Sequence, residues 1–72
     1  MTYTVIFEQG PASWGAYVPD LPGCIAVCDS REEVEHEIQD AIQFHVEGLR
    51  AAGQEIPRVT SFAGTVEVSP AA

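Results

Sequence analysis

The sequence predicts an α+β fold in the order β-β-β-α-β, in which one long helix covers one face of a four-stranded sheet. Three observations predict it. Apolar and polar residues alternate over short stretches, as they do in strands. A Pro/Gly corner, PDLPG at 19–23, separates two of these stretches. A signal typical of a helix N-terminus then begins at Ser30.

The first three strands are predicted at 2–8, 13–18 and 24–28. Their connections are short, so the three strands should form an antiparallel meander. In the second strand, alternation places Trp14 and Tyr17 on opposite faces, and at most one of them can join the main core.

The corner at 19–23 is stiff because its two prolines restrict the backbone. Pro22 followed by Gly23 favours a type II turn, in which Gly23 takes a positive φ. Such a corner holds the flanking strands in register. It also exposes Asp20 and Leu21 to a partner in a fixed arrangement, so that binding costs little conformational entropy. Two interpretations stay open, a purely structural hairpin and a preorganised contact for a partner.

The helix is predicted to start with Ser30 as its N-cap, in a capping box with Glu33. Gly53 suits the position after the helix, and Pro57 prevents its continuation. The apolar stripe expected to face the sheet consists of Val34, Ile38, Ala41, Ile42, His45 and Leu49.

A short fourth strand is predicted at 64–70, after the loop that follows the helix. The crossover through the helix should be right-handed, which would place this strand parallel to the first one.

Length and charge restrict the possible functions. A chain of 72 residues forms one domain, here 1–72, with a small core. Without disulfides or metal, such a core favours self-association, as a dimer or tetramer.

The chain has eleven acidic residues, three arginines and no lysine, which gives a net charge of −8. This charge disfavours nucleic-acid binding and favours a basic partner. No signal peptide or membrane span is visible, so a cytoplasmic protein is expected.

The reactive side chains do not form a catalytic or metal-binding pattern. Cys24 and Cys28 share one face of a strand but lie about 13 Å apart, too far for a disulfide or a shared metal ion. His36 and His45 lie on different sides of the helix without an obvious partner. Most acidic residues fall outside the apolar stripe and indicate a solvated face. We therefore expect no enzymatic activity, no cofactor and no metal site.

The corner and its surroundings resemble the HicB-like antitoxins. Residues 16–24, AYVPDLPGC, are similar to the family's VPDLPGC signature. The opening YTVIFE, the acidic helix entry at 30–33 and GQEIP at 53–57 agree with the family in order. The resemblance implies a partial RNase H-like fold. It also implies a partner, HicA, a small basic toxin that cleaves mRNA with a histidine.

The function expected from this resemblance is that of an antitoxin that binds and occludes a HicA-type toxin. The candidate contact residues near the corner are Trp14, Tyr17, Asp20 and Leu21. Many family members carry a C-terminal DNA-binding domain, and since this chain stops at Ala72 we expect no direct operator binding. Cys28 precedes Asp29 where relatives often have glycine. The alternative is a small homo-oligomer that binds a ligand, or an interaction module with another partner.

Overall fold

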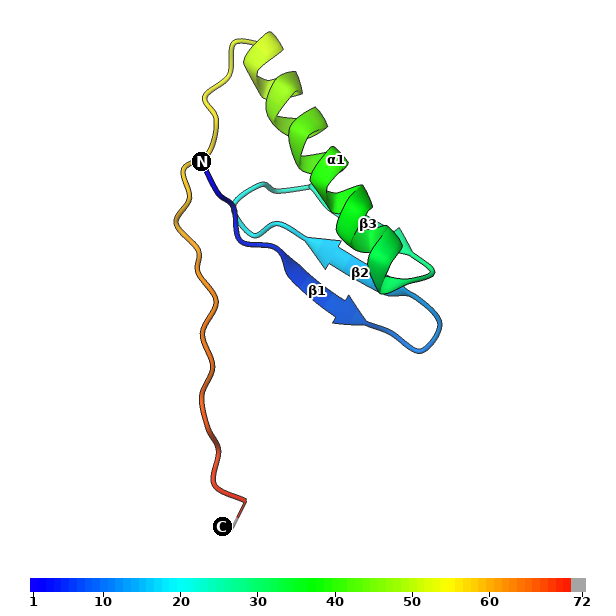
Figure 1. The fold of residues 1–72 in the computed structure, drawn as a ribbon. Coiled ribbons are helices and arrows are strands. Elements are labelled where there is room, and N and C mark those ends of the chain that lie inside the picture. The colour runs from blue at the N-terminus through cyan, green and yellow to red at the C-terminus, as the bar shows by residue number, and fades with distance from the viewer. Residues whose placement is uncertain (71–72) are drawn as a thin grey trace.

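The computed structural model describes residues 1–70 and contains a three-stranded sheet followed by one helix (Figure 1). Strand β1 spans Ile6–Gln9, β2 spans Trp14–Tyr17 and β3 spans Ile25–Cys28. Helix α1 spans Arg31–Ala51. The strands are antiparallel in the order β1-β2-β3, which confirms the α+β class and the predicted meander.

Helix α1 lies across one face of the sheet, mainly over β2 and β3 (Figure 1). Directly opposed residues of antiparallel strands share a face, and the register pairs Phe7 with Ala16 and Ala16 with Ala26. This row faces the helix. The buried core between the two layers is small and consists of Ala16, Val18, Leu21, Cys24, Val34 and Ile38.

The corner between β2 and β3 is a double turn. The amide of Leu21 donates to the carbonyl of Val18, and the amide of Cys24 donates to the carbonyl of Leu21, both at 3.0 Å. Gly23 has φ 84°, as a type II turn requires at this position. The predicted turn is therefore confirmed, and it directs the Leu21 side chain into the core, where it is fully buried.

Both predicted ends of the helix are confirmed. The amide of Glu33 donates to the Ser30 hydroxyl at 3.2 Å, and that hydroxyl donates to the Glu33 carboxylate at 3.0 Å. At the other end Gly53 has φ 71°, and its amide donates to the Arg50 carbonyl at 3.1 Å. The amide of Gln54 reaches the Leu49 carbonyl at 2.9 Å, which completes a Schellman motif.

The chain after the helix returns toward the start of the first strand. The Tyr3 hydroxyl donates to the Pro57 carbonyl at 2.6 Å, and the Thr4 hydroxyl donates to the Ser61 carbonyl at 2.9 Å. Within residues 1–70 no helix combines the length and the apolar character that a membrane span requires.

The predicted strand at 64–70 is not confirmed. None of residues 64–70 is assigned to a strand, and the sheet formed by the described residues has three strands in place of four. The physical reason is that a strand needs a hydrogen-bonding neighbour, whatever its side-chain alternation. Beyond Ser61 the backbone runs away from β1 instead of alongside it (Figure 1). The four-stranded RNase H-like sheet is accordingly not confirmed.

Candidate protein-binding surface

The face of the sheet opposite α1 is uncovered and largely apolar. The register pairs Ile6 with Tyr17 and Tyr17 with Ile25, so these three side chains form one row across the sheet. Val27 lies two residues along β3 on the same face. Ile25 and Val27 are 65% and 70% exposed, and Tyr17 is 40% exposed. We call these residues, Ile6, Tyr17, Ile25 and Val27, the open face.

The structure separates the four residues predicted as partner contacts. Tyr17 belongs to the open face, whereas Trp14 packs partly against the core on the helix side. The predicted placement of these two aromatics on opposite faces is therefore confirmed. The guanidinium of Arg31 lies over the Trp14 ring, 6.0 Å from its centroid, in a cation–π arrangement. Leu21 is fully buried, so a partner that docks on this structure does not reach its side chain.

Asp20 connects the corner to the chain that follows the helix. One carboxylate oxygen accepts hydrogen bonds from the amides of Thr60 and Ser61, each at 3.0 Å. The other oxygen accepts from the hydroxyls of the same two residues, each at 2.8 Å. These hydrogen bonds, that from the Ser61 amide foremost, lower the pKa of Asp20 from 3.8 to about 2. The ionised Asp20 side chain therefore links the corner to residues 60–61 by hydrogen bonds.

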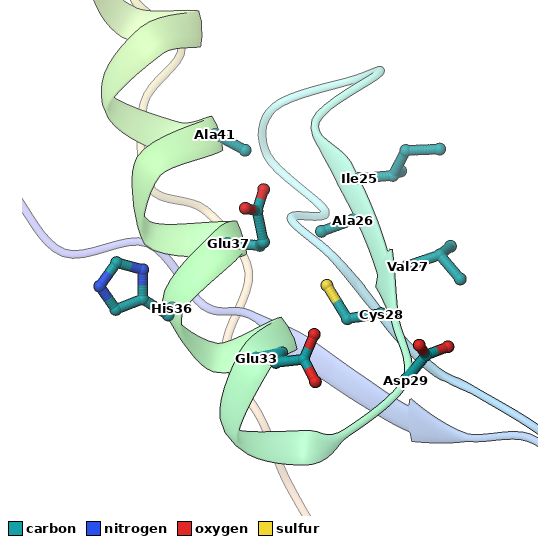
Figure 2. A pocket seen from close by; sticks show the side chains of 9 residues that line it. All are labelled: Ile25, Ala26, Val27, Cys28, Asp29, Glu33, His36, Glu37 and Ala41. Atoms are coloured by element: carbon teal, nitrogen blue, oxygen red, sulfur yellow. The ribbon is translucent and has the colours of Figure 1, made fainter.

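A groove of about 560 Å³ runs between α1 and β3. Figure 2 shows Glu33 and Glu37 on the helix and Asp29 just after β3, at the rim of this groove. Cys28 points from β3 toward the helix, while Ile25 and Val27 point to the opposite side of the strand (Figure 2). Strand β3 thus carries apolar side chains of the open face on one side and borders a group of carboxylates on the other.

The cysteines are held in the protonated thiol form. Burial raises the pKa of the Cys24 thiol. Burial and then the carboxylates of Glu37, Glu33 and Asp29 raise the pKa of the Cys28 thiol. Because the thiolate is the reactive species, neither side chain is prepared to act as a nucleophile.

The other candidate chemical groups are dispersed. His36 is highly exposed at the border of the groove, and its Nδ1 lies 3.6 Å from the Asp40 carboxylate. In the described part of the chain, no three His, Cys, Asp or Glu side chains converge in a way that could hold a metal ion. The surface offers apolar contact area and negative charge, which suits binding to another protein.

A protein-family model described as "HicB_like antitoxin of bacterial toxin-antitoxin system" matches residues 3–70. The chain belongs to this family. The match confirms the resemblance seen in the corner motif and extends it over nearly the whole chain.

Curated relatives agree with the HicB-like assignment. A UPF0150 protein of Thermoplasma acidophilum is 34% identical over 59 residues, covering 81% of this chain and 86% of the relative. A UPF0150 protein of Synechocystis is 35% identical over 57 residues, covering 78% of this chain and 72% of the relative. An uncharacterized 14.9 kDa protein of Haemophilus phage HP1 is 33% identical over 58 residues. That match covers 81% of this chain but only 44% of the phage protein. No solved structure shows a significant match.

Sequence reasoning did not single out several residues of this HicB-like surface. Alternation places Ile25 and Val27 on one face of their strand, but nothing in the pattern indicates that this face is the uncovered one. Nothing in the sequence around Thr60 and Ser61 indicates that they bind Asp20, because Asp20 lies 40 and 41 residues earlier in the chain.

Proposed function

We propose that the chain is an antitoxin that binds a small basic, mRNA-cleaving toxin of the HicA type and occludes its RNA-binding face. The observation that carries this proposal is the uncovered apolar face of the sheet, with the carboxylates of Asp29, Glu33 and Glu37 on the other side of β3. Membership of a family of antitoxins supports a role in neutralising a toxin.

The distribution of charge suits a basic partner. Residues 29–55 contain eight of the eleven acidic residues and two of the three arginines, which leaves a net charge of −6 on this part of the chain. A toxin that holds RNA must present positive charge to phosphates. Opposite charge on the helix side of this chain would increase the rate of encounter and orient the two proteins.

The open face supplies the apolar contacts that charge alone does not provide. Interfaces are stabilised mainly by buried aromatic and apolar side chains near their centre. Tyr17 is the predicted contact residue that lies on this face, and Ile25 and Val27 enlarge the apolar area beside it. Asp20 and Leu21 support the same surface indirectly, by holding the corner that connects β2 to β3.

Occlusion requires no chemistry from the antitoxin. The proposed function therefore does not depend on a catalytic group, a cofactor or a metal ion in this chain. The same negative charge would oppose direct contact with nucleic-acid phosphates, so we propose that the domain alone does not bind RNA or DNA.

The test is co-expression with a small basic toxin of the HicA type. The wild-type chain should relieve the growth arrest caused by the toxin and co-elute with it in gel filtration. Val27→Asp should weaken both effects strongly, because it replaces an exposed apolar side chain of the proposed contact by a strongly hydrated carboxylate.

Phe44→Asp is the matched control. Phe44 is also highly exposed, and the substitution adds the same charge, but it lies on α1 away from the open face. This variant should neutralise the toxin as the wild type does. Equal neutralisation by Val27→Asp, or equal loss with Phe44→Asp, would show that the open face is not the contact.

A further inference from the structure

Gly15 leaves a gap in the middle of the uncovered side of the sheet. It lies in the central strand β2, on the same side as Tyr17, and the register pairs it with Glu8 of β1 and with Val27 of β3. Glu8, Gly15 and Val27 therefore form a second row across the sheet, beside the row that contains Tyr17. Because glycine has no side chain, nothing fills the centre of this row. We call this position the notch.

The fold itself does not require glycine at this position. The φ of Gly15 is not positive, and its pairing continues without a bulge on both sides. A Cβ added to Gly15 would meet one atom within 4 Å, the Ala26 carbonyl oxygen, at an ordinary contact distance of 3.9 Å. Glycine inside a strand lowers stability relative to residues with a side chain. Without a bulge or a bend to explain it, a strand glycine marks a place where another molecule approaches the backbone closely.

The residues around the notch combine negative charge with an aromatic ring. Glu8 lies directly opposite Gly15, so its Cβ is about 5 Å from the position of the missing side chain. Tyr17 follows two residues along β2 and is 40% exposed. Glu8 and Tyr17 are diagonal neighbours in the register and can reach a common partner. Within residues 1–70, the Glu8 carboxylate takes part in no ion pair and no hydrogen bond.

These surroundings suit an arginine side chain better than an apolar one. A guanidinium group stacks on aromatic rings and pairs with carboxylates through two hydrogen bonds. Its aliphatic stem would lie over the Gly15 backbone, beside Val27. An apolar side chain in the notch would remove water from Glu8 without giving it a partner, which is unfavourable. The net charge of −8 also favours an approaching partner that is basic.

We propose that the notch at Gly15 receives an arginine side chain of the toxin, which pairs with Glu8 and stacks on Tyr17. This inference rests on the proposed function, because it names the group by which the basic partner docks on the open face. The carboxylates of the helix side act over a distance and steer the encounter, whereas the notch sets the position of the partner on the sheet. Gly15 and Glu8 therefore determine specificity for the toxin.

Filling the notch tests the proposal. The dissociation constant is measured by calorimetry with a HicA-type toxin whose catalytic histidine is replaced by alanine. Gly15→Thr should raise this constant by about tenfold or more, because the threonine side chain occupies the place of the arginine stem. The same variant should unfold at the same urea concentration as the wild type or at a higher one, since threonine favours strands. Weaker binding by a fold of undiminished stability cannot come from unfolding.

Gly48→Thr is the matched control for Gly15→Thr. Gly48 lies on α1, and an added Cβ there meets no atom within 4 Å. The substitution adds the same atoms at an exposed glycine away from the open face. It should leave the dissociation constant unchanged.

Removing the charge of Glu8 tests the nature of the occupant. Glu8→Gln should accelerate dissociation of the toxin about three- to tenfold, because it removes a direct ionic contact. Glu67→Gln removes the same charge from a residue outside the sheet and should leave the dissociation rate unchanged. Each arginine of the toxin is then replaced by alanine in turn. One of these substitutions should weaken binding to the wild-type chain strongly but binding to Glu8→Gln and Gly15→Thr little, as coupled residues do.

The outcomes separate failure of the notch from failure of the proposed function. A wild-type chain that does not bind the toxin overturns the proposed function and the notch with it. If the wild type binds, Val27→Asp does not and Gly15→Thr binds as the wild type does, the open face is the contact but the notch proposal is wrong. The proposal is also wrong if no arginine of the toxin couples to Glu8, since the occupant of the notch is then a different group.

Discussion

Asp20 shows how one side chain can connect distant parts of a small protein. Its carboxylate accepts hydrogen bonds from two amides and two hydroxyls that follow the helix, at distances of 2.8 to 3.0 Å. Carboxylates that accept several such bonds are stabilised in the charged form. Asp20 therefore stabilises the connection between the corner and residues 60–61 most strongly when it is ionised.

This dependence on ionisation predicts the behaviour at low pH. The pKa of Asp20 is about 2 in the folded chain and 3.8 ordinarily, so the contribution of Asp20 to stability is complete only above about pH 5. It is lost progressively as the pH falls from about 5 through 2. Hydrogen exchange of the Thr60 and Ser61 amides should accelerate over this range, relative to the intrinsic rates. Asp20→Asn should produce the same acceleration at neutral pH, and Asp29→Asn, at an exposed position, should not.

At the scale of the element, α1 is the most self-sufficient part of the structure. Its 21 residues extend about 31 Å, while each four-residue strand extends about 13 Å. Only the helix residues over the sheet are buried, namely Val34 and Ile38, and the later turns are more exposed. The stability of the exposed half therefore depends on local helix chemistry and on its C-terminal Schellman motif.

Two glycines, one inside the exposed half of α1 and one just after its end, should respond oppositely to substitution by alanine. Gly48 lies inside α1, and a Cβ added there meets no atom within 4 Å. Gly48→Ala should therefore stabilise the chain by about 1 kcal/mol. Gly53 has φ 71°, where alanine is strained, and Gly53→Ala should destabilise it by roughly 1–2 kcal/mol. Urea denaturation of both variants measures the difference; equal signs would contradict this account of the helix end.

At the scale of the whole molecule, the chain has surfaces of different character. The helix and its flanks carry most of the negative charge, and the open face is apolar. Residues 62–68 carry exposed apolar side chains beyond the edge of the sheet. Negative charge and apolar contact area are thus carried by separate surfaces of one small domain.

This separation predicts how salt should affect toxin binding. Steering by charge acts on the association rate and is screened within about 8 Å at physiological ionic strength. Replacing both Glu33 and Glu37 by glutamine should lower the association rate for a HicA-type toxin by roughly three- to tenfold at low salt. It should change the dissociation rate little. Stopped-flow measurements over a range of salt concentrations test this, with Glu67→Gln as the control outside the acidic region.

The features that were correctly predicted from the sequence depend on interactions between near neighbours in the chain. Ser30 and Glu33 form the helix cap, and Pro22 and Gly23 form the turn, within four residues of each other. Alternation also correctly separated Trp14 from Tyr17. Local backbone preference and hydrogen bonding decide such features, so the sequence carries them in full.

Only the tertiary structure decided which surfaces remain free. The strand at 25–28 has apolar residues on both faces, and their alternation does not indicate which face the helix covers. In the structure, the small side chains of Ala26 and Cys28 lie under α1, whereas Ile25 and Val27 are exposed. Leu21 was predicted as a contact, but the turn directs it into the core. The pattern at 64–70 is that of a strand, yet this segment does not join the sheet formed by the described residues. Side-chain alternation specifies the two faces of a strand, whereas pairing and burial depend on partners that are distant in sequence or lie in another molecule.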